Sequence, residues 1–391
     1  MPTSEARNLI YRAALPVLAP SPRGQMTHSR SGQPLISFGA YERLLVRHHV
    51  LGACLLLRRG EVVARVDTSV ARPKHIAGPD TLYRVASITK MATALVTLSL
   101  VADGAFTLDT PVAGLLPGGE KEPALRNVTV RQLLSHTSGL RDVPAMDAAL
   151  RQGQSWHEVL RTDGVRVGEA GASFSYCNLA FGLMGCLLEQ VTGTAVSSLF
   201  AQRLFEPLGM RATLDASGLS PERIMPISRV LRYHRGQDVT VTALGRIPLT
   251  AADPDLHFGH TAGAMYTDAP SLDRLLRLIL GDGALEGRQL LPETLVREMK
   301  HRQASYGQLS PGMTYGLGLV RLEDPKLPGR LILGHQGYAY GCADGAFADE
   351  KTGDTVILLN GGCSEAREGR LGLCNRDVLR WALGKELPQW S

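Results

Sequence analysis

Residues 81–101 read Thr81-Leu-Tyr-Arg-Val-Ala-Ser-Ile-Thr-Lys90-Met-Ala-Thr-Ala-Leu-Val-Thr-Leu-Ser-Leu-Val101. After Lys90, apolar residues fall on every face of a helix, and no charged residue occurs before Asp103. This pattern predicts a buried helix rather than an amphipathic one. A lysine in the first turn of such a helix is unexpected, because an unpaired buried ammonium is costly.

Lysine is scarce in this chain, since only seven of the 42 basic residues are lysines. Arginine keeps its charge, whereas a desolvated lysine can lose its proton. Ser87 stands three residues before Lys90, so both lie on one helical face and can touch. A seryl hydroxyl is a weak nucleophile that needs such a base. Alternatively, Ser87 caps the helix and Lys90 is a surface lysine.

The composition predicts a globular chain with a large core, because 44% of the 391 residues are hydrophobic and 20% are charged. The net charge of +5 is spread along the chain and aromatic residues make up 5%, so nucleic acid is not an expected partner. No window is long enough for a membrane helix, and no membrane partner is expected.

The six cysteines form no C-x-x-C pair, and several of them lie in apolar segments. They predict reduced core residues in a cytoplasmic protein. The segment 8–20 is faintly signal-like, but Arg12 and Pro16 interrupt its apolar part, and secretion is the alternative.

Strand patterns occupy both ends of the chain and helical patterns its middle. This order predicts an α/β (α+β) fold, in which an antiparallel sheet from both chain ends is flanked by helices and carries an inserted, mostly helical domain. We expect a loosely ordered arm at 1–37, a sheet-and-helix domain at 38–105 plus 301–391, and the insert at 106–300. The expected strands are 51–57, 61–66, 316–322, 330–333, 343–348 and 355–360, with terminal helices at 40–48 and 367–383. A polar segment at 233–238 has no predicted place.

A second chemistry-bearing stretch is Ser173-Phe-Ser-Tyr-Cys-Asn178, which runs into a predicted helix. A tyrosine near a lysine can act as a phenolate base, and an asparagine amide can hold a lysine or a substrate carbonyl. Alternatively, Tyr176 is a half-buried tyrosine and Asn178 caps the helix.

A third stretch, Leu331–Gly341, is an apolar strand that becomes a glycine-rich edge carrying His335. Glycines there let a ligand or another backbone approach closely. The pattern His-x-Gly also occurs at 234–236 and 257–259, so His335 is distinguished by its place on a strand followed by another at 343–348.

Together the three stretches resemble the serine β-lactamase and penicillin-binding-protein superfamily, especially its branch of class C β-lactamases, D-aminopeptidases and family VIII esterases. The resemblance spans about residues 40–385. It includes Val128–Leu140, Leu204–Met210, Ala262–Thr267 and Tyr315–Gly318. It implies the β-lactamase/transpeptidase-like fold, an active site in the cleft between the two domains, and no cofactor.

The resemblance also implies roles for individual residues. Ser87 would be the acylated nucleophile, and Lys90 and Tyr176 would share the proton as base and acid. Asn178 would orient Lys90 and the substrate amide. The backbone N–H groups of Ser87 and Tyr338 would form an oxyanion hole, which can be worth ~3–4 kcal/mol of barrier.

The substrate-binding residues implied are Asn178, His335, Gly337 and Tyr338. His335 stands where many relatives have the lysine of K-T-G, and a histidine is largely neutral at pH 7. Esters or amides without a carboxylate are therefore expected in place of β-lactams. The literal Lys351-Thr-Gly353 separates two apolar runs and predicts a hairpin turn. The class A element E-x-x-L-N is missing, so deacylation would depend on Lys90 and Tyr176.

Other polar residues have simpler explanations. His136 could pair with a nucleophile, but the family-like loop explains it structurally. His257 and His260 have helical spacing without a carboxylate-rich third ligand, so no metal is expected. Cys177 is interpreted as a packing residue.

Three functions follow. The first is a serine hydrolase that cleaves small esters or amides through a Ser87 acyl-enzyme. The second is a D-amino-acid-directed peptidase (D-aminopeptidase or D-Ala-D-Ala carboxypeptidase) or weak β-lactamase. The third is a non-catalytic binding protein, against which the intact Ser87, Lys90 and Tyr176 argue. The expected partner is a small-molecule ester, amide or peptide, and the expected state is a monomer or small homo-oligomer. Loops 140–172 and 230–262 would shape the pocket.

Overall fold

The computed structural model describes residues 21–32, 38–72, 74–232, 249–339 and 341–384, together with residues 15, 17 and 19. The polar segment at 233–238 and most of the signal-like segment at 8–20 lie outside the described residues. Within the described part, no single helix is long and apolar enough to cross a membrane. The helical segments Asn178–Thr192 and Val196–Phe205 reach the required length and composition only as a pair, and the chain bends by 87° between them.

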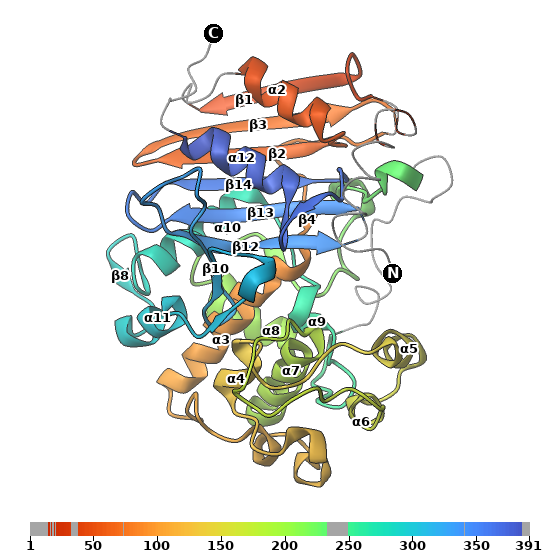
Figure 1. Ribbon diagram of the computed structural model, residues 1–391, viewed down its shortest axis with the longest axis vertical. Coiled ribbons are helices and arrows are strands. Elements are labelled where there is room, and N and C mark those ends of the chain that lie inside the picture. The colour runs from red at the N-terminus through yellow and green to blue at the C-terminus, as the bar shows by residue number, and fades with distance from the viewer. Residues whose placement is uncertain are drawn as a thin grey trace.

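The molecule is built on a nine-stranded sheet in the order β1-β3-β2-β14-β13-β12-β11-β10-β9 (Figure 1). Every neighbouring pair is antiparallel. N-terminal β2 pairs with C-terminal β14, so both chain ends build one sheet, as the fold prediction required. The strands are β1 (Met26–Gly32), β2 (Ala53–Arg59), β3 (Val62–Val70), β9 (Ala304–Ser305), β10 (Met313–Tyr315), β11 (Val320–Leu322), β12 (Ile332–Ala339), β13 (Cys342–Asp349) and β14 (Thr355–Asn360).

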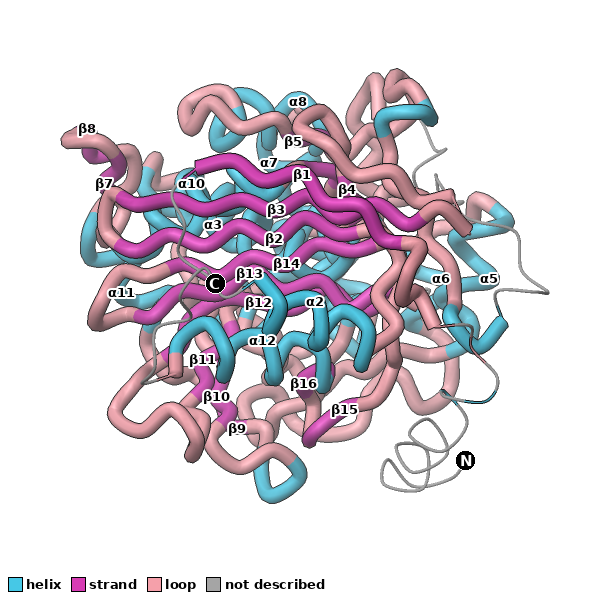
Figure 2. The backbone as a smooth tube through the Cα atoms, turned by 90° about the horizontal axis from the view of Figure 1, so that it is seen from above, coloured by secondary structure: helices cyan, strands magenta, loops and turns pink. Residues whose placement is uncertain are grey.

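Helices cover both faces of the sheet (Figure 2). Helices α2 (Phe38–Arg47) and α12 (Leu373–Leu383) pack on one face through apolar residues that include Tyr41, Leu45 and Val378. On the other face lie α10 (Ala269–Leu280) and α3 (Thr89–Ala102), which contact β14 and β12 respectively. Because both faces are covered, β13 and β14 are buried along their whole length.

The remaining helices gather beneath the sheet around α3 (Figure 1). They are α4 (Val130–Leu134), α5 (Pro144–Gln152), α6 (Trp156–Leu160), α7 (Asn178–Thr192), α8 (Val196–Phe200), α9 (His260–Gly263) and α11 (Glu293–Lys300). The short strands are β4 (Tyr83–Arg84), β5 (Ala212–Thr213), β6 (Tyr266–Thr267), β7 (Ala284–Leu285), β8 (Arg288–Gln289), β15 (Arg367–Glu368) and β16 (Leu371–Gly372).

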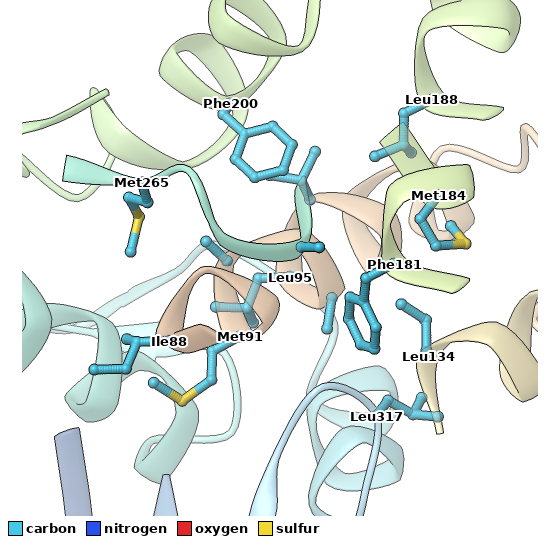
Figure 3. Close-up of a cluster of buried hydrophobic side chains, with 14 of the residues drawn as sticks. Ile88, Met91, Leu95, Leu134, Phe181, Met184, Leu188, Phe200, Met265 and Leu317 are labelled. Carbon is cyan, nitrogen blue, oxygen red and sulfur yellow. The ribbon is translucent and has the colours of Figure 1, made fainter. Parts of the chain in front are cut away.

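Helix α3 is buried from Thr89 to Leu100, which confirms the predicted buried helix. Figure 3 shows its side chains Met91 and Leu95 among Phe181 and Met184 of α7 and Phe200 of α8. Its apolar residues point in all directions because helices surround it on several sides. A residue on this helix is therefore held rigidly.

Three expectations about the fold were wrong in part. Residues 26–32 belong to the sheet as β1 and not to a loosely ordered arm, because they pair with β3 along seven residues. The predicted helix 367–383 begins only at Leu373, and residues 367–372 form the β15–β16 hairpin. Helix α10 lies within the expected insert, yet it packs on the sheet. The turn at 351–353 is confirmed, since it joins the antiparallel β13 and β14.

Candidate active site

Ser87 lies in a short 3₁₀ turn, η1 (Ala86–Ile88), that leads directly into α3. Ala86 before it has a φ of 45°, a left-handed conformation that is costly for a residue with a Cβ. The turn is anchored by the Val85 N–H, which donates to the Met265 carbonyl at 3.0 Å. Ala86 and Ile88 are buried, whereas Ser87 is partly exposed. The hydroxyl is therefore the part of this turn that a substrate can reach.

Lys90 lies one helical turn further on, with no exposed surface. Its Nζ lies 3.0 Å from the Oγ of Ser87, 2.8 Å from the Oδ1 of Asn178 and 2.7 Å from the carbonyl oxygen of Ala262. Burial lowers the pKa of Lys90 from 10.5 to about 7, and the charge of Asp142 opposes this shift. A neutral amine can donate to Asn178 and Ala262 and still accept a proton from Ser87.

Tyr176 approaches Ser87 from the segment that precedes α7. Its hydroxyl donates to the Oγ of Ser87 at 2.8 Å. Burial raises the pKa of Tyr176 above its ordinary value, so the phenol stays protonated near neutral pH. Lys90 is thus suited to take a proton from Ser87, and Tyr176 is suited to give one.

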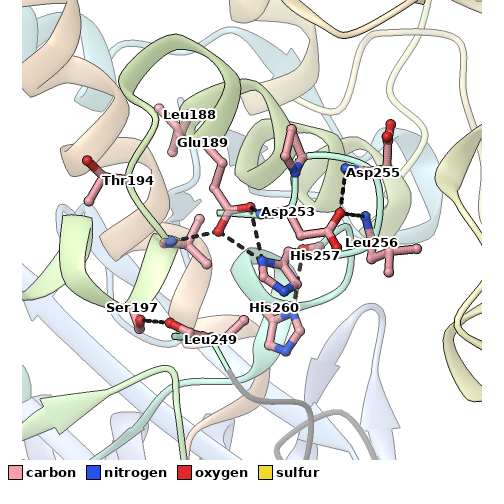
Figure 4. Close-up of polar contacts among 12 residues, drawn as sticks. Leu188, Glu189, Thr194, Ser197, Leu249, Asp253, Asp255, Leu256, His257 and His260 are labelled. Atoms are coloured by element: carbon pink, nitrogen blue, oxygen red, sulfur yellow. Dashed lines mark hydrogen bonds and ion pairs between the residues drawn. The ribbon is translucent and has the colours of Figure 1, made fainter. Parts of the chain in front are cut away.

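A buried polar network beneath the site positions α9, the helix that supplies the Ala262 carbonyl (Figure 4). The Glu189 carboxylate of α7 is fully buried and accepts hydrogen bonds from the Val196 N–H at 2.8 Å and the His257 Nδ1 at 2.9 Å. The His260 ring in turn contacts the His257 carbonyl. These bonds join α7, α8 and α9. His257 and His260 both belong to this network. Among the residues that the structure describes, neither this network nor any other set of three or more His, Cys, Asp or Glu side chains is arranged to hold a metal ion.

His335 lies on β12 at the edge of the site and is buried. Its Nδ1 lies 2.7 Å from the Gln336 carbonyl oxygen, which can only accept, so Nδ1 carries the proton. Its Nε2 then accepts from the Tyr315 hydroxyl at 3.0 Å. Burial lowers the pKa of His335 to about 3. The imidazole is therefore neutral where relatives are expected to carry a lysine.

Gly337 lets β12 approach the turn that carries Ser87. A Cβ at Gly337 would lie 2.2 Å from the Val85 carbonyl oxygen, closer than any side chain could sit. Tyr338 follows it on the strand and donates its hydroxyl to the Glu365 carbonyl. The Arg367 guanidinium lies 3.6 Å from the centre of the Tyr338 ring. The glycine thus sets the distance between strand and nucleophile.

These residues surround one pocket of about 130 Å³. Of the predicted site residues, Ser87, Tyr176, Asn178, His335 and Tyr338 line it, while Lys90 lies beneath Ser87 and Gly337 supports the strand. The rest of the lining comprises Tyr306, Val320, Gln336, Arg367 and Arg370.

His136 and Cys177, for which the sequence favoured a structural role, lie around this pocket. The Nδ1 of His136 accepts the Cys177 N–H at 3.1 Å, and its ring lies 4.3 Å from that of Tyr176, so it supports the loop. The Sγ of Cys177 accepts the Ala180 N–H and thereby caps α7. The alternative in which Asn178 caps the helix is wrong, because Asn178 is its first residue.

Sequence reasoning missed several members of the site. Asp142, which receives hydrogen bonds from the start of α7, lies two residues after the end of the family-like motif Val128–Leu140, and this nearness is its one signal in the sequence. The Ala262 carbonyl is a backbone group and has no residue-type signal. Arg367 and Arg370 fell in a segment predicted to be helical.

Comparison with known proteins gives a consistent result. The chain is 29% identical to the esterase EstB of Burkholderia gladioli, over 87% of this chain and 93% of that protein. It is 31% identical to a D-aminopeptidase of Brucella anthropi, over 80% of this chain and 57% of that protein. The crystal structure of a D-stereospecific amidohydrolase from Streptomyces sp. superposes with a TM-score of 0.68 at 26% identity, covering 89% and 98% of the two chains.

The family model described as Beta-lactamase matches residues 39–366, which include every residue of the pocket except Arg367 and Arg370. The match extends from α2 to the segment before β15 and so covers most of the sheet and the helices beneath it. This chain therefore belongs to the β-lactamase family and is a hydrolase of that family.

Proposed function

We propose that this chain is a serine hydrolase that cleaves small esters or amides through an acyl-enzyme on Ser87. The observation that carries the proposal is the unexposed Lys90, whose Nζ lies 3.0 Å from the Oγ of Ser87. Its pKa of about 7 leaves a large neutral fraction near neutral pH, as a general base requires.

Acylation begins when Lys90 takes the Ser87 proton and Oγ attacks the substrate carbonyl. The negative charge that develops on the carbonyl oxygen is received by the backbone N–H groups of Ser87 and Tyr338. Tyr176 then gives its hydroxyl proton to the leaving alcohol or amine, and the Lys90 ammonium returns a proton to Tyr176. Water hydrolyses the acyl-enzyme by the same proton transfers in reverse.

The volume of the pocket and its neutral His335 favour small acyl groups without a carboxylate. Its volume of about 130 Å³ is below the ~300–1,000 Å³ of sites for drug-sized ligands. The neutral His335 supplies no charge for a substrate carboxylate. The name of the relative EstB as an esterase agrees with this substrate class.

A fluorophosphonate probe tests the proposal, with the modified residue located by peptide mapping. We expect one adduct, on Ser87, and none in Ser87→Ala. Short-chain aryl esters should then be hydrolysed by the unaltered protein and not by the variant. Labelling that survives Ser87→Ala would exclude Ser87 as the nucleophile.

A D-amino-acid-directed peptidase or weak β-lactamase is the second candidate, because Arg367 and Arg370 line the pocket. Guanidinium groups bind carboxylates well. On this alternative, Arg367→Ala and Arg370→Ala raise the KM for D-Ala-containing peptides several-fold and leave the KM for neutral esters unchanged. Fluorescent penicillin should form an adduct at Ser87, and its absence at saturation would count against this candidate.

A further inference from the structure

Asp142 binds the start of α7 through both carboxylate oxygens. Its Oδ1 accepts the backbone N–H groups of Asn178 at 2.6 Å and Leu179 at 3.0 Å. Its Oδ2 accepts the side-chain amide of Asn178 at 2.7 Å. The residue lies in the loop between α4 and α5 and does not line the pocket.

These contacts determine which way the Asn178 amide faces. An ionised carboxylate can only accept hydrogen bonds, so the NH₂ group of Asn178 must face Asp142. The amide oxygen then faces Lys90, at 2.8 Å from Nζ. A rotated amide would place its oxygen against the carboxylate and its NH₂ group against the donors of Lys90. Asp142 thus excludes the orientation that would leave Lys90 without an acceptor.

We propose that Asp142 is a positioning residue of the hydrolytic reaction, which holds the Asn178 oxygen on Lys90 and thereby keeps Lys90 directed at Ser87. The inference rests on the proposed function of Ser87. Asp142 touches none of the reacting atoms and acts through Asn178.

Several other groups surround Lys90, and their charges define the expected pH effect. Asp142 and Cys177 raise the pKa of Lys90, whereas burial, the largest cause, and Arg84 lower it. The titratable groups that face Lys90 from neighbouring elements are Arg84 on β4, His136 after α4, Tyr176 and Cys177 before α7, and His335 on β12. Removing the charge at position 142 therefore lowers the pKa of Lys90 further.

The test measures the second-order rate constant of Ser87 acylation by a fluorophosphonate between about pH 5 and about pH 9. This range includes the pKa of Lys90, which is about 7. In Asp142→Asn, the new amide still accepts the two backbone N–H groups but meets the NH₂ group of Asn178. We expect acylation to fall ~10–100-fold, because the base is no longer held in line. The acidic limb of the profile should move to lower pH by on the order of half a unit.

The exchange variant, Asp142→Asn with Asn178→Asp, separates positioning from a general loss of structure. The amide at 142 now donates to the carboxylate at 178, whose second oxygen can accept from Lys90. Its acidic limb should move to higher pH than that of the unaltered protein, since the negative charge is closer to Lys90. The control is Asp147→Asn, which removes an exposed carboxylate of α5 and should leave the profile unchanged.

Opposite shifts in the single and exchange variants support the inference. The inference is overturned if Ser87 is labelled in all four proteins and the acidic limb of the pH profile lies at the same pH in each of them. This holds even when Asp142→Asn reacts more slowly or is less stable. If Ser87 of the unaltered protein is never labelled, the proposed function fails and this inference fails with it.

Discussion

The substitution Lys90→Met tests the charge state of the buried lysine through stability. Burial lowers the pKa of Lys90 from 10.5 to about 7 in the folded protein. Between these values the unfolded chain binds the proton more tightly, so the free energy of unfolding rises with pH over this window. The lowered pKa of Lys90 destabilises the folded protein by ~4 kcal/mol at pH 7 and by ~2 kcal/mol at pH 9. Methionine does not titrate, so Lys90→Met lacks this destabilisation at either pH.

Urea unfolding at pH 7 and pH 9 measures this difference. The unaltered protein should gain ~2 kcal/mol from pH 7 to pH 9 relative to Lys90→Met. The variant also leaves the oxygens of Asn178 and Ala262 without a donor, at a cost of ~1–3 kcal/mol each. That cost does not vary with pH and cancels in the comparison. Lys326→Met, at an exposed lysine, is the matched control and should show no relative change.

An equal pH dependence in the unaltered protein and Lys90→Met would refute a low pKa for this lysine. The same variant should lose acylation of Ser87 by ~10²–10⁴-fold, as expected when a general base is removed. Unchanged acyl transfer together with higher stability would instead favour a non-catalytic binding protein.

Two further substitutions test the acid and the strand. Tyr176→Phe removes the hydroxyl that donates to Ser87. It should lower kcat for ester hydrolysis ~10²–10⁴-fold and leave the circular dichroism spectrum unchanged. A kcat within about twofold of the original would contradict the role of Tyr176 as the acid. Gly337→Ala places a Cβ 2.2 Å from the Val85 carbonyl oxygen and should push β12 away from the turn that carries Ser87. The free energy of unfolding should fall by ~1–3 kcal/mol, and kcat should fall as well. Gly168→Ala is the control, because a Cβ there meets open space, and it should leave stability and kcat unchanged.

Much of the fold was predictable because its signals are local and strong. The unbroken apolar run after Lys90 predicts burial on every side, and α3 is buried accordingly. Strand patterns at both ends predict a shared sheet, and β2 pairs with β14. The edge strand β1 was missed because Met26–Gly32 is polar, and its pairing with β3 depends on backbone hydrogen bonds. Residues 367–372 were assigned to a helix because the start of α12 has no side-chain cap, since its N-cap residue is Gly372.

The candidate site was predictable where side-chain chemistry distinguishes a residue, as for Ser87, Lys90 and Tyr176. Their roles stay predictions, although the structure brings them within hydrogen-bond distance. The parts that the sequence did not reveal act through the backbone or through a second residue. The Ala262 carbonyl carries no information in its side chain, and Asp142 acts through the orientation of Asn178.

The pairing of β2 with β14 has a consequence for how the protein is made. Ala53 pairs with Asn360, so most of the chain must be synthesised before the central strands of the sheet can meet. Such long-range pairing slows folding, because the entropy of closing a long loop is lost before the contacts form. A nascent chain in which α3 and α7 have emerged from the ribosome already contains Ser87 and Tyr176, but it lacks β12 and its neighbours. Premature termination before β12 should therefore yield a fragment without hydrolase activity, with no partly active intermediate during translation.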